Sequence, residues 1–523
     1  MINILVIFGA SGDLTSRKLI PALFQLFIKK ELPEPFFVVG VSRTPMTDQE
    51  WRTKLRSTTI EFNATKFDNS SWNQFKKHIY YFPGNIQSLT MFKSLKQFLK
   101  DLEKNATQKR TEEEQEESKF NSSRKGTNCV YYLSIAPKLY ADTITHLGNA
   151  GMTEESTLLN QPIELRKIII EKPFGTSLST ARELNQRTHQ VFREDQVYRI
   201  DHYLGKETVN NIFALRFANT IFEPIWNRNY IDHIQITANE AQTVGHRGAF
   251  YETAGVLRDM FQNHLLQLLT ITTMEPPNRF DAQSVRDEKV KVLRSIRSMT
   301  PEYIYNNTIR GQYSHYRDEK GVDPHSNIAT FAAIKLYIDN WRWNNVPIYL
   351  RSGKGMSCQT TQIVIQYKEP PHSIFRSNRH PDSKIQLEAN RLLIQIQPSE
   401  GIKLGFMSKV PGTEMELRNS NLTFSFHDHY SEELPEAYQR LLLDAFSGDA
   451  SLFARNDEVE AAWEIIDPIQ HNWDKTASSE AIHSYPVGFW GPDASEKWMQ
   501  NQGKQWFNLC PVINSSGKQS PLH

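Results

Sequence analysis

Residues 2–14 read INILVIFGASGDL, and this stretch predicts how the first part of the chain folds. The apolar run 2–8 is rich in β-branched side chains, which is typical of a parallel strand buried on both faces. A glycine turn follows at 9–12, and residues 13–29 then have the apolar spacing of a helix. Such a turn can hold a phosphate, because glycines let the backbone approach the anion and the helix start offers N–H groups. The pattern is Gly-x-x-Gly rather than Gly-x-Gly-x-x-Gly, which alone is weak evidence for a nucleotide site.

The next apolar runs, at 36–41, 130–133 and 168–170, alternate with segments of helical spacing. This alternation predicts an open α/β domain of Rossmann type. Arg43 follows the second run, at the place where an acidic residue would accept the ribose 2′-hydroxyl of NAD. An arginine there suits the 2′-phosphate of NADP, and an ordinary surface cation is the alternative interpretation.

The pattern changes after about residue 203, where strand-like runs are widely spaced and a long apolar helix is predicted at 255–273. The predicted strands are 231–237, 330–337, 346–350, 362–367 and 391–397. Strands without regular βαβ alternation indicate an α+β domain on a mainly antiparallel sheet. We therefore expect a Rossmann-type domain at 1–202, an α+β domain at 203–510 for substrate binding and dimerisation, and a flexible tail at 511–523. The polar stretch 101–127 is interpreted as an inserted solvated loop or extended surface helix, with a partner-binding segment as the alternative.

The composition excludes several classes of protein. The chain has 523 residues with 60 Lys+Arg and 59 Asp+Glu, a net charge of +1, which argues against a nucleic-acid binder. No apolar run reaches the ~18 residues of a membrane span, and the N-terminus lacks the pattern of a signal peptide, so we expect a cytoplasmic protein. The three cysteines, Cys129, Cys358 and Cys510, are too few and scattered to predict a disulfide framework or a zinc site.

Residues 199–207, RIDHYLGKE, hold the strongest candidates for chemistry. A helix starting near Asp201 would place His202 and Lys206 on one face, where they could grip one phosphate; a solvated helix face is the alternative. His264 lies in the predicted apolar helix beside Asp259 and Asn263. A histidine there is either a packed core residue or a general base whose ring a carboxylate orients.

Eight motifs together resemble the glucose-6-phosphate dehydrogenase family, from about residue 3 to about residue 505. RIDHYLGKE is highly specific for that family. The others are GASGDL at 9–14, EKPFG at 171–175, RFAN at 216–219, PIWNRNYID at 224–232, RDMFQNHLLQ at 258–267, VPIYLRSGK at 346–354 and RLLLDAFSGD at 440–449.

The resemblance implies oxidation of D-glucose 6-phosphate to 6-phospho-D-glucono-1,5-lactone with reduction of NADP, the first step of the oxidative pentose phosphate pathway. It implies that His264 is the general base and that Asp201 orients it. The implied substrate residues are Lys18, Lys172, His202, Tyr203, Lys206, Glu240, Asp259 and Lys354. The implied cofactor residues are Gly9, Ala10, Ser11, Gly12, Asp13, Leu14, Arg43 and Lys172, with a Lys172-Pro173 peptide that is often cis in the family.

The implied partners are glucose 6-phosphate and NADP, with NAD as a weaker alternative and no metal. Nucleic acid and membranes are not expected as partners, and the family's habit suggests a homodimer or homotetramer. Animal-type members hold a second, structural NADP with basic residues after the SGK turn. Residues 358–362 here carry no cation, so we expect no such site. The alternatives are a non-catalytic nucleotide-sensing relative and a dual NAD/NADP hexose-6-phosphate dehydrogenase; the presence of Asp201, His202, Lys206 and His264 argues against the first.

Overall fold

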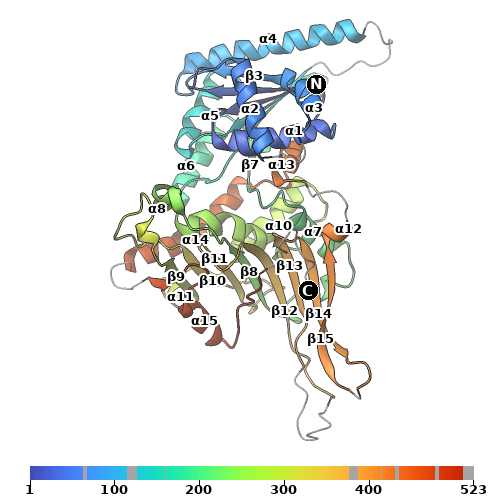
Figure 1. Cartoon of the computed structure of the whole chain (residues 1–523), viewed down its shortest axis with the longest axis vertical. Coiled ribbons are helices and arrows are strands. Elements are labelled where there is room, and N and C mark those ends of the chain that lie inside the picture. The colour runs from blue at the N-terminus through green and yellow to red at the C-terminus, as the bar shows by residue number, and fades with distance from the viewer. Residues whose placement is uncertain are drawn as a thin grey trace. The chain divides into compact units, whose positions relative to one another are not determined.

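The computed structural model describes residues 1–62, 67–114, 126–158, 161–375, 387–413, 415–429, 435–476 and 482–510 (Figure 1). The chain divides into two compact units. The first unit comprises Met1–Gly205, Asn278–Arg286 and Pro435–Glu460, and the second comprises Lys206–Pro277, Asp287–Leu434 and Ala461–His523. Neither unit contains, among the described residues, a helix long and apolar enough to cross a membrane.

The first unit is built on a seven-stranded sheet in the order β3-β2-β1-β4-β6-β5, with β7 also paired to β6. Its strands are β1 (Ile2–Phe8), β2 (Phe36–Ser42), β3 (Ile79–Pro83), β4 (Thr127–Leu133), β5 (Ser156–Leu158), β6 (Gln161–Ile170) and β7 (Val197–Arg199). All pairs are parallel except β5 with β6. Every residue of β1 and of β4 is buried, as expected for central strands covered on both faces.

Two groups of helices cover this sheet. Helices α1 (Ile20–Ile28), α2 (Asp48–Phe62) and α3 (Asn69–Phe75) contact one another, as do α4 (Leu89–Glu114), α5 (Tyr140–Asn149) and α6 (Leu178–His189) in a second chain of contacts. In the sheet, β2 and β3 lie on one side of β1, and β4 and β6 lie on the other side. Right-handed crossovers therefore place the two groups on opposite faces. Helix α13 (Ala437–Ser447) contacts α1 and β4.

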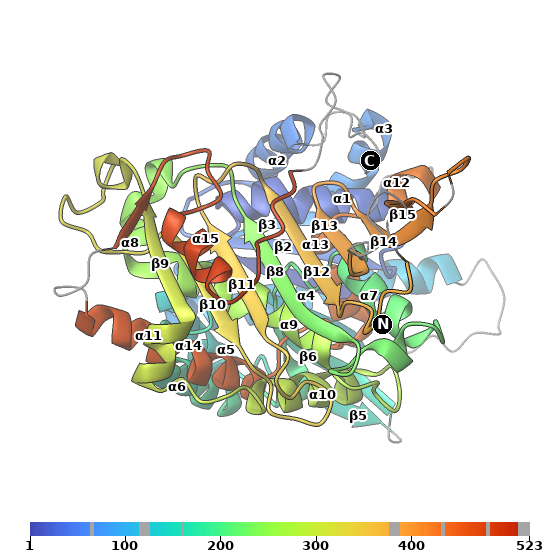
Figure 2. The same cartoon turned by 90° about the horizontal axis from the view of Figure 1, so that it is seen from below.

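The second unit is built on a nine-stranded sheet in the order β15-β14-β13-β12-β8-β11-β10-β9-β16 (Figure 2). Its strands are β8 (Ile231–Asn239), β9 (Thr308–Tyr313), β10 (Phe331–Leu336), β11 (Ile348–Gly353), β12 (Thr360–Tyr367), β13 (Arg391–Gln397), β14 (Gly401–Lys409), β15 (Leu417–Ser425) and β16 (His483–Tyr485). Only the pairs β8–β11 and β9–β16 are parallel. The predicted fold class is confirmed: a Rossmann-type α/β domain and a larger α+β domain with a mainly antiparallel sheet.

A helical layer packs on β8, β11 and β13 of this sheet. It contains α7 (Glu207–Phe217), the π-helix Leu257–Leu265 and α9 (Leu266–Thr273). The other helices of the chain are α8 (Gly248–Val256), α10 (Ala282–Arg294), α11 (Pro301–Asn307), α12 (Phe426–His429), α14 (Asn456–Thr476) and α15 (Asp493–Gln500). The long helix predicted at 255–273 is therefore present, but its first half is π-helical and begins after Gly255, whose φ of 60° breaks it from α8.

One expectation from the sequence is wrong. No helix starts near Asp201: residues 201–205 form a turn, and α7 begins at Glu207. The Asp201 side chain accepts a hydrogen bond from the Tyr203 N–H at 3.0 Å, which favours the turn over a helix. The three cysteines are too few and scattered to predict a disulfide framework; the structure has a single disulfide among the described residues, between Cys358 and Cys510.

The interpretation of 101–127 and of the tail is tested only in part. Helix α4 continues to Glu114, so the first half of the polar stretch is a helix, while residues 115–125 lie outside the described residues. The tail predicted at 511–523 also lies outside them.

Candidate active site

The glycine turn follows the carboxyl end of β1 and is bonded to the end of β2. The N–H groups of Gly9 and Ala10 both donate to the Val41 carbonyl, at 2.9 and 3.1 Å. Gly9 has a φ of 90°, and a Cβ on it would lie 1.9 Å from the Ser134 carbonyl oxygen, so only glycine fits there. The chain then enters a π-helical turn, Thr15–Leu19. The backbone therefore approaches and begins a helix at the sheet edge where a dinucleotide phosphate is held in such folds.

Side chains of residues 42, 51 and 54 bond to this turn. The Ser11 and Ser42 hydroxyls lie 2.7 Å apart, and the Trp51 indole donates to the Ala10 carbonyl at 3.2 Å. Lys54 donates to the Ser11 carbonyl at 3.1 Å. Arg43 is exposed directly after β2. Lys54 was not among the predicted residues, because its distance in sequence from the turn gives no signal.

A second polar cluster of the first unit lies at the end of β6. Glu171 accepts hydrogen bonds from the hydroxyls of Tyr132 and, at 3.1 Å, Tyr438. Burial raises the pKa of Glu171. The next peptide, Lys172-Pro173, is cis, as the family resemblance implied. The two tyrosines therefore fix the residue that precedes Lys172.

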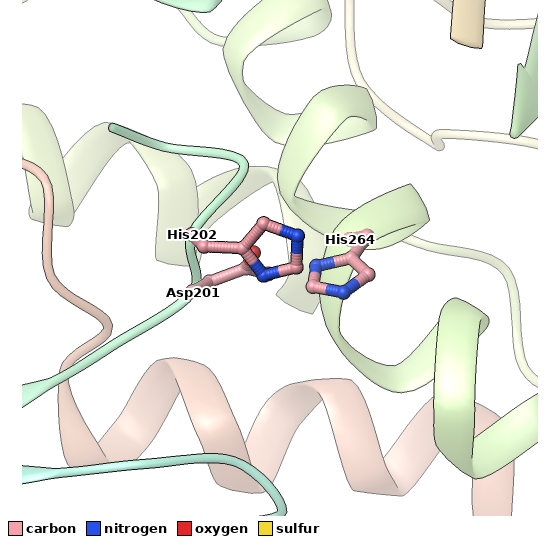
Figure 3. Close-up of side chains that lie close together, drawn as sticks. All are labelled: Asp201, His202 and His264. Atoms are coloured by element: carbon pink, nitrogen blue, oxygen red, sulfur yellow. The ribbon is translucent and has the colours of Figure 1, made fainter. Parts of the chain in front are cut away.

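The residues Asp201, His202 and Tyr203 lie in the turn that follows β7. The turn is bonded to the end of β6 through the Ile200 N–H, which donates to the Ile170 carbonyl at 2.9 Å. Asp201 is buried, with 2% of its surface exposed, and the rings of His202 and Tyr203 lie 5.1 Å apart. Figure 3 shows Asp201 and His202 on this loop. A buried carboxylate held in a tight turn has a defined position, as an orienting group needs.

His264 belongs to the second unit and lies on the π-helix Leu257–Leu265 (Figure 3). Only 1% of its surface is exposed, and its backbone N–H donates to the Asn263 side chain at 2.7 Å. The wider helical turn changes which side chains face each other. Such π-helical segments are rare and are frequent at functional sites.

An ion triad includes Asp259 of this helix, and one of its members, Glu240, is 38% exposed. The Lys354 ammonium contacts Asp259 at 3.0 Å and also contacts Glu240. Burial lowers the pKa of Lys354, but the two carboxylates outweigh this and leave its pKa above the usual value. The backbone keeps the same residues together, because the Glu240 N–H donates to the Gly353 carbonyl at 3.0 Å. Three of the predicted substrate residues are thus assembled within one unit.

Two other predicted cations have different partners. Lys206 is the N-cap residue of α7 and donates to the Gln397 side chain. Lys18 lies in the π-helical turn after the glycine turn, 3.4 Å from Glu436, with both side chains about half exposed. Gln397 and Glu436 were not predicted, because each comes from a distant part of the chain.

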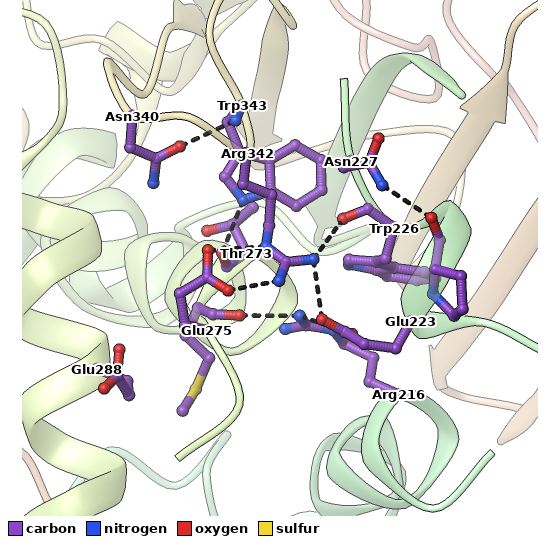
Figure 4. A network of polar contacts seen from close by, with 12 residues as sticks. Arg216, Glu223, Trp226, Asn227, Thr273, Glu275, Glu288, Asn340, Arg342 and Trp343 are labelled. Carbon is purple, nitrogen blue, oxygen red and sulfur yellow. Dashed lines mark hydrogen bonds and ion pairs between the residues drawn. The ribbon is translucent and has the colours of Figure 1, made fainter. Parts of the chain in front are cut away.

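The motifs RFAN and PIWNRNYID stabilise the helix that carries His264 (Figure 4). Arg216 donates to the carbonyls of Ile271 and Met274, at 3.1 and 2.8 Å. Trp226 and Trp343 donate to the carbonyls of residues 272 and 273. These donors satisfy carbonyls that a helix end leaves without a partner.

The charge of Arg216 is balanced within the same network. Arg216 contacts Glu223 at 3.3 Å, and Glu223 contacts Arg342 at 2.8 Å. Arg342 also pairs with Glu275. Both motifs therefore have a structural role at the end of α9.

Two family models together match most of the chain. Residues 6–211 match the family model "Glucose-6-phosphate dehydrogenase, NAD binding domain", and residues 213–507 match its C-terminal domain. A glucose-6-phosphate 1-dehydrogenase of Aggregatibacter actinomycetemcomitans is 41% identical over 512 residues, which cover 96% of this chain and 96% of that one. One of Chlamydia pneumoniae is 38% identical over 513 residues, which cover 96% of this chain and 95% of that one. These matches define the class: an oxidoreductase with a dinucleotide-binding domain.

Solved structures extend the likeness to three dimensions. A glucose-6-phosphate dehydrogenase in complex with its substrate glucose 6-phosphate has a TM-score of 0.84 and 32% identity, covering 97% of this chain and 98% of that one. The Mycobacterium avium glucose-6-phosphate 1-dehydrogenase has a TM-score of 0.77 and 31% identity, with 97% and 99% covered. The chain belongs to the glucose-6-phosphate dehydrogenase family.

Proposed function

We propose that the chain oxidises D-glucose 6-phosphate at C1 to 6-phospho-D-glucono-1,5-lactone and reduces NADP to NADPH. This reaction opens the oxidative branch of the pentose phosphate pathway. The observations that carry the proposal lie in the second unit: the π-helix that holds the buried His264 also holds Asp259, and the Lys354 ammonium pairs with Asp259 and Glu240. These residues supply a base and paired carboxylates, which suits recognition of sugar hydroxyls and proton removal.

The proposed base is His264, which takes the proton of the C1 hydroxyl as the C1 hydride leaves. Asp201 is proposed to orient the imidazole and to stabilise its charged form. Both side chains are buried, so the charge pair would form away from water, where it is stronger. Glu240 and Asp259 are proposed to hydrogen-bond the sugar hydroxyls, and Lys354 to fix the orientation of both carboxylates.

The 6-phosphate is proposed to be bound by His202, Tyr203 and Lys206, with Lys18 adding positive charge. Lys172 is proposed to lie between sugar and cofactor. Binding a dianion far from C1 helps to fix the reacting carbon in a near-attack geometry. Because Lys206 donates to Gln397 in the structure, phosphate binding would have to exchange that hydrogen bond for a charge-assisted one.

The residues of the first unit fit a dinucleotide. The positive φ of Gly9 and its close approach to the Ser134 carbonyl allow the tight turn after β1, and Arg43 follows β2. The bound dinucleotide would supply the hydride acceptor. Residues 9–14 are proposed to hold its phosphates, and Arg43 the 2′-phosphate that distinguishes NADP from NAD.

Steady-state rates with NADP and with NAD, each with glucose 6-phosphate and with glucose, test this proposal. We expect a kcat/KM above about 10⁴ M⁻¹s⁻¹ for glucose 6-phosphate with NADP, and lower values for the other three pairs. Equal rates with glucose and glucose 6-phosphate would refute the phosphate site. If neither NADP nor NAD is reduced in the presence of glucose 6-phosphate, the proposed dehydrogenase activity is refuted.

We also propose that the chain assembles into homodimers or homotetramers. The edge strand β15 leaves Leu422 62% exposed, and open strand edges with apolar side chains favour association. Sedimentation velocity over a range of concentrations tests this, and a monomer at all concentrations would contradict it.

A further inference from the structure

The disulfide between Cys358 and Cys510 has no part in the proposed chemistry. The two cysteines are 152 residues apart in the sequence and both are half-buried. Cys358 lies four residues after Lys354, and Cys510 is the last residue described at the C-terminal end. The bond therefore joins the turn after β11 to the segment 504–510.

The segment 504–510 lies on the polar face of the nine-stranded sheet. The Gln235 side chain donates to the Gln505 carbonyl and accepts from the Phe507 N–H, both at 2.9 Å. The Gln362 side chain donates to the Phe507 carbonyl, also at 2.9 Å. Figure 2 shows this last part of the chain, in dark red, running across the strands. Side chains of β8 and β12 thus hold the segment as they would hold a bound peptide.

The same segment shields a buried guanidinium. Arg351 on β11 is fully buried, 4.3 Å from the Trp506 ring and 5.1 Å from the Trp490 ring, and it donates to the Asn508 side chain at 2.9 Å. Burial lowers the pKa of Arg351 to about 9. Removal of the segment would expose this cation together with the sheet glutamines.

The other end of the disulfide is held firmly. The N–H groups of residues 355, 356 and 357 donate to the carbonyls of Gln242, Glu240 and Phe489, at 2.9, 3.0 and 2.9 Å. Cys358 therefore ends a fixed turn, whereas Cys510 ends a segment held mostly by side chains. Breaking the disulfide is expected to free the segment rather than the turn.

We propose that Cys358 and Cys510 form a reversible redox modification site, at which a dithiol reductant releases the segment 504–510 from the sheet. One thiolate of the reductant attacks a disulfide sulfur and forms a mixed disulfide, and its second thiolate resolves it. The protein gains two electrons and two protons as two thiols, and the dithiol becomes an intramolecular disulfide. The reverse exchange with a small disulfide oxidant restores the bond.

The third cysteine provides an internal control. Cys129 is a free thiol with 3% of its surface exposed, and burial raises its pKa to about 11. Such a thiol carries almost no thiolate near neutral pH and is inert to exchange. The variant Cys129→Ser thus removes a thiol without touching the proposed site.

The first experiment counts thiols in the full-length protein after equilibration in mixtures of reduced and oxidised dithiothreitol. Each sample is quenched with acid, unfolded and alkylated, and its mass is measured. We expect one alkyl group per chain in oxidising mixtures and three in reducing ones, in a single step, with Cys129→Ser showing none and two. Three alkyl groups in every mixture would overturn the proposal, and so would one in every mixture.

The second experiment measures release of the segment. Lys504 is a trypsin site that is held by Asp232 at 2.5 Å in the closed segment. Under native conditions we expect cleavage after Lys504 to be faster by at least tenfold in the reduced protein and in Cys510→Ser than in the oxidised protein. The melting temperature should fall by about 5 °C, because the closed loop no longer restricts the unfolded chain. Cys129→Ser is the reference variant. If the cleavage rate and the melting temperature are the same in the oxidised protein, the reduced protein and Cys510→Ser, the proposed release of the segment is wrong.

Discussion

Two buried lysines, one in each unit, differ in the groups that surround them. Lys167 in the first unit is 5% exposed and donates to the carbonyls of Ala445 and Phe446, at 2.8 and 2.9 Å, where α13 ends. Lys354 in the second unit is 7% exposed and faces the carboxylates of Asp259 and Glu240. Burial lowers the pKa of Lys167 to about 8, whereas the carboxylates keep that of Lys354 above its usual value.

This comparison teaches that burial alone does not mark a functional lysine. Lys167 satisfies carbonyls at a helix end, so its role is complete within the fold. Lys354 pairs with two carboxylates, and one of them, Asp259, lies on the helix that carries the buried His264. The first lysine is therefore interpreted as structural and the second as part of the active site.

The variant His264→Asn is the strongest test that the surroundings of Lys354 are the site of reaction. Loss of a general base should lower kcat by about 10²–10⁴-fold with little change in KM, because the base acts in the chemical step. Steady-state kinetics with glucose 6-phosphate measure this, and circular dichroism controls for folding. A kcat near that of the unaltered enzyme would remove His264 from the mechanism.

The pair Lys354→Met and Lys167→Met tests the comparison itself. Lys354→Met leaves Asp259 and the partly exposed Glu240 without their cation, which should cost about 1–3 kcal/mol of stability and lower kcat/KM by about tenfold to a hundredfold. Lys167→Met should lower stability but leave kcat/KM of the folded enzyme within about twofold. If both variants lose activity equally at a temperature where both are folded, the distinction between a structural Lys167 and an active-site Lys354 is wrong.

The variant Lys206→Ala tests the proposed phosphate grip, which lies outside the triad. Loss of one charge-assisted hydrogen bond should raise KM for glucose 6-phosphate by about tenfold to a hundredfold, with a smaller change in kcat. The measurement is repeated with glucose as substrate. If the reaction of glucose is impaired to the same extent, Lys206 does not bind the phosphate.

The variant Arg43→Ala tests the cofactor side, where the cation is exposed rather than buried. Its loss should raise KM for NADP by about tenfold and leave KM for NAD nearly unchanged, since only NADP carries the 2′-phosphate. Lys54→Ala is the matched control, because Lys54 bonds the backbone of the same turn. If KM rises equally for NADP and for NAD, Arg43 does not bind the 2′-phosphate.

The pH dependence of stability gives the smallest expected effect. The pKa of Lys167 is about 8 in the folded protein, against about 10.4 in an unfolded chain. Between these values the unfolded state binds more protons, so the contribution of Lys167 to stability rises with pH. For Lys354 the folded pKa is raised, so its contribution is fully present below about pH 10.4 and is lost only above it.

Urea unfolding of the unaltered protein and of both methionine variants checks this between about pH 7 and pH 10. The difference between the unaltered protein and Lys167→Met should shift in favour of lysine as pH rises. The difference for Lys354→Met should stay level. A level difference for Lys167 would contradict the lowered pKa.

Local patterns explain what the sequence could predict. The strand at 2–8, the glycine turn and the strand at 231–237 were predictable, because continuous apolar runs and alternation reflect burial directly. Strands β14 and β15 were missed, because most of their residues are only partly buried or exposed and show no clean alternation. The π-helix was missed, because its apolar spacing is close to that of an α-helix.

Contacts between distant segments explain what the sequence could not predict. The disulfide joins residues 152 positions apart, and the Lys354 triad joins β8, the π-helix and the end of β11. The sequence predicts a helix at Asp201 where the structure has a turn. The spacing of residues along the chain does not reveal the hydrogen bond from the Tyr203 N–H to the Asp201 side chain that favours the turn. The candidate residues themselves came mostly from the resemblance, and their roles remain proposals.

The central claim is that this chain moves a hydride from C1 of glucose 6-phosphate to NADP. Reaction with glucose 6-phosphate deuterated at C1, followed by mass spectrometry of both products, tests it most directly. We predict that the deuterium is found in the NADPH and that the 6-phosphogluconolactone, or the acid it hydrolyses to, contains none. Deuterium retained in the sugar product, or NADPH formed without deuterium, would contradict the claim.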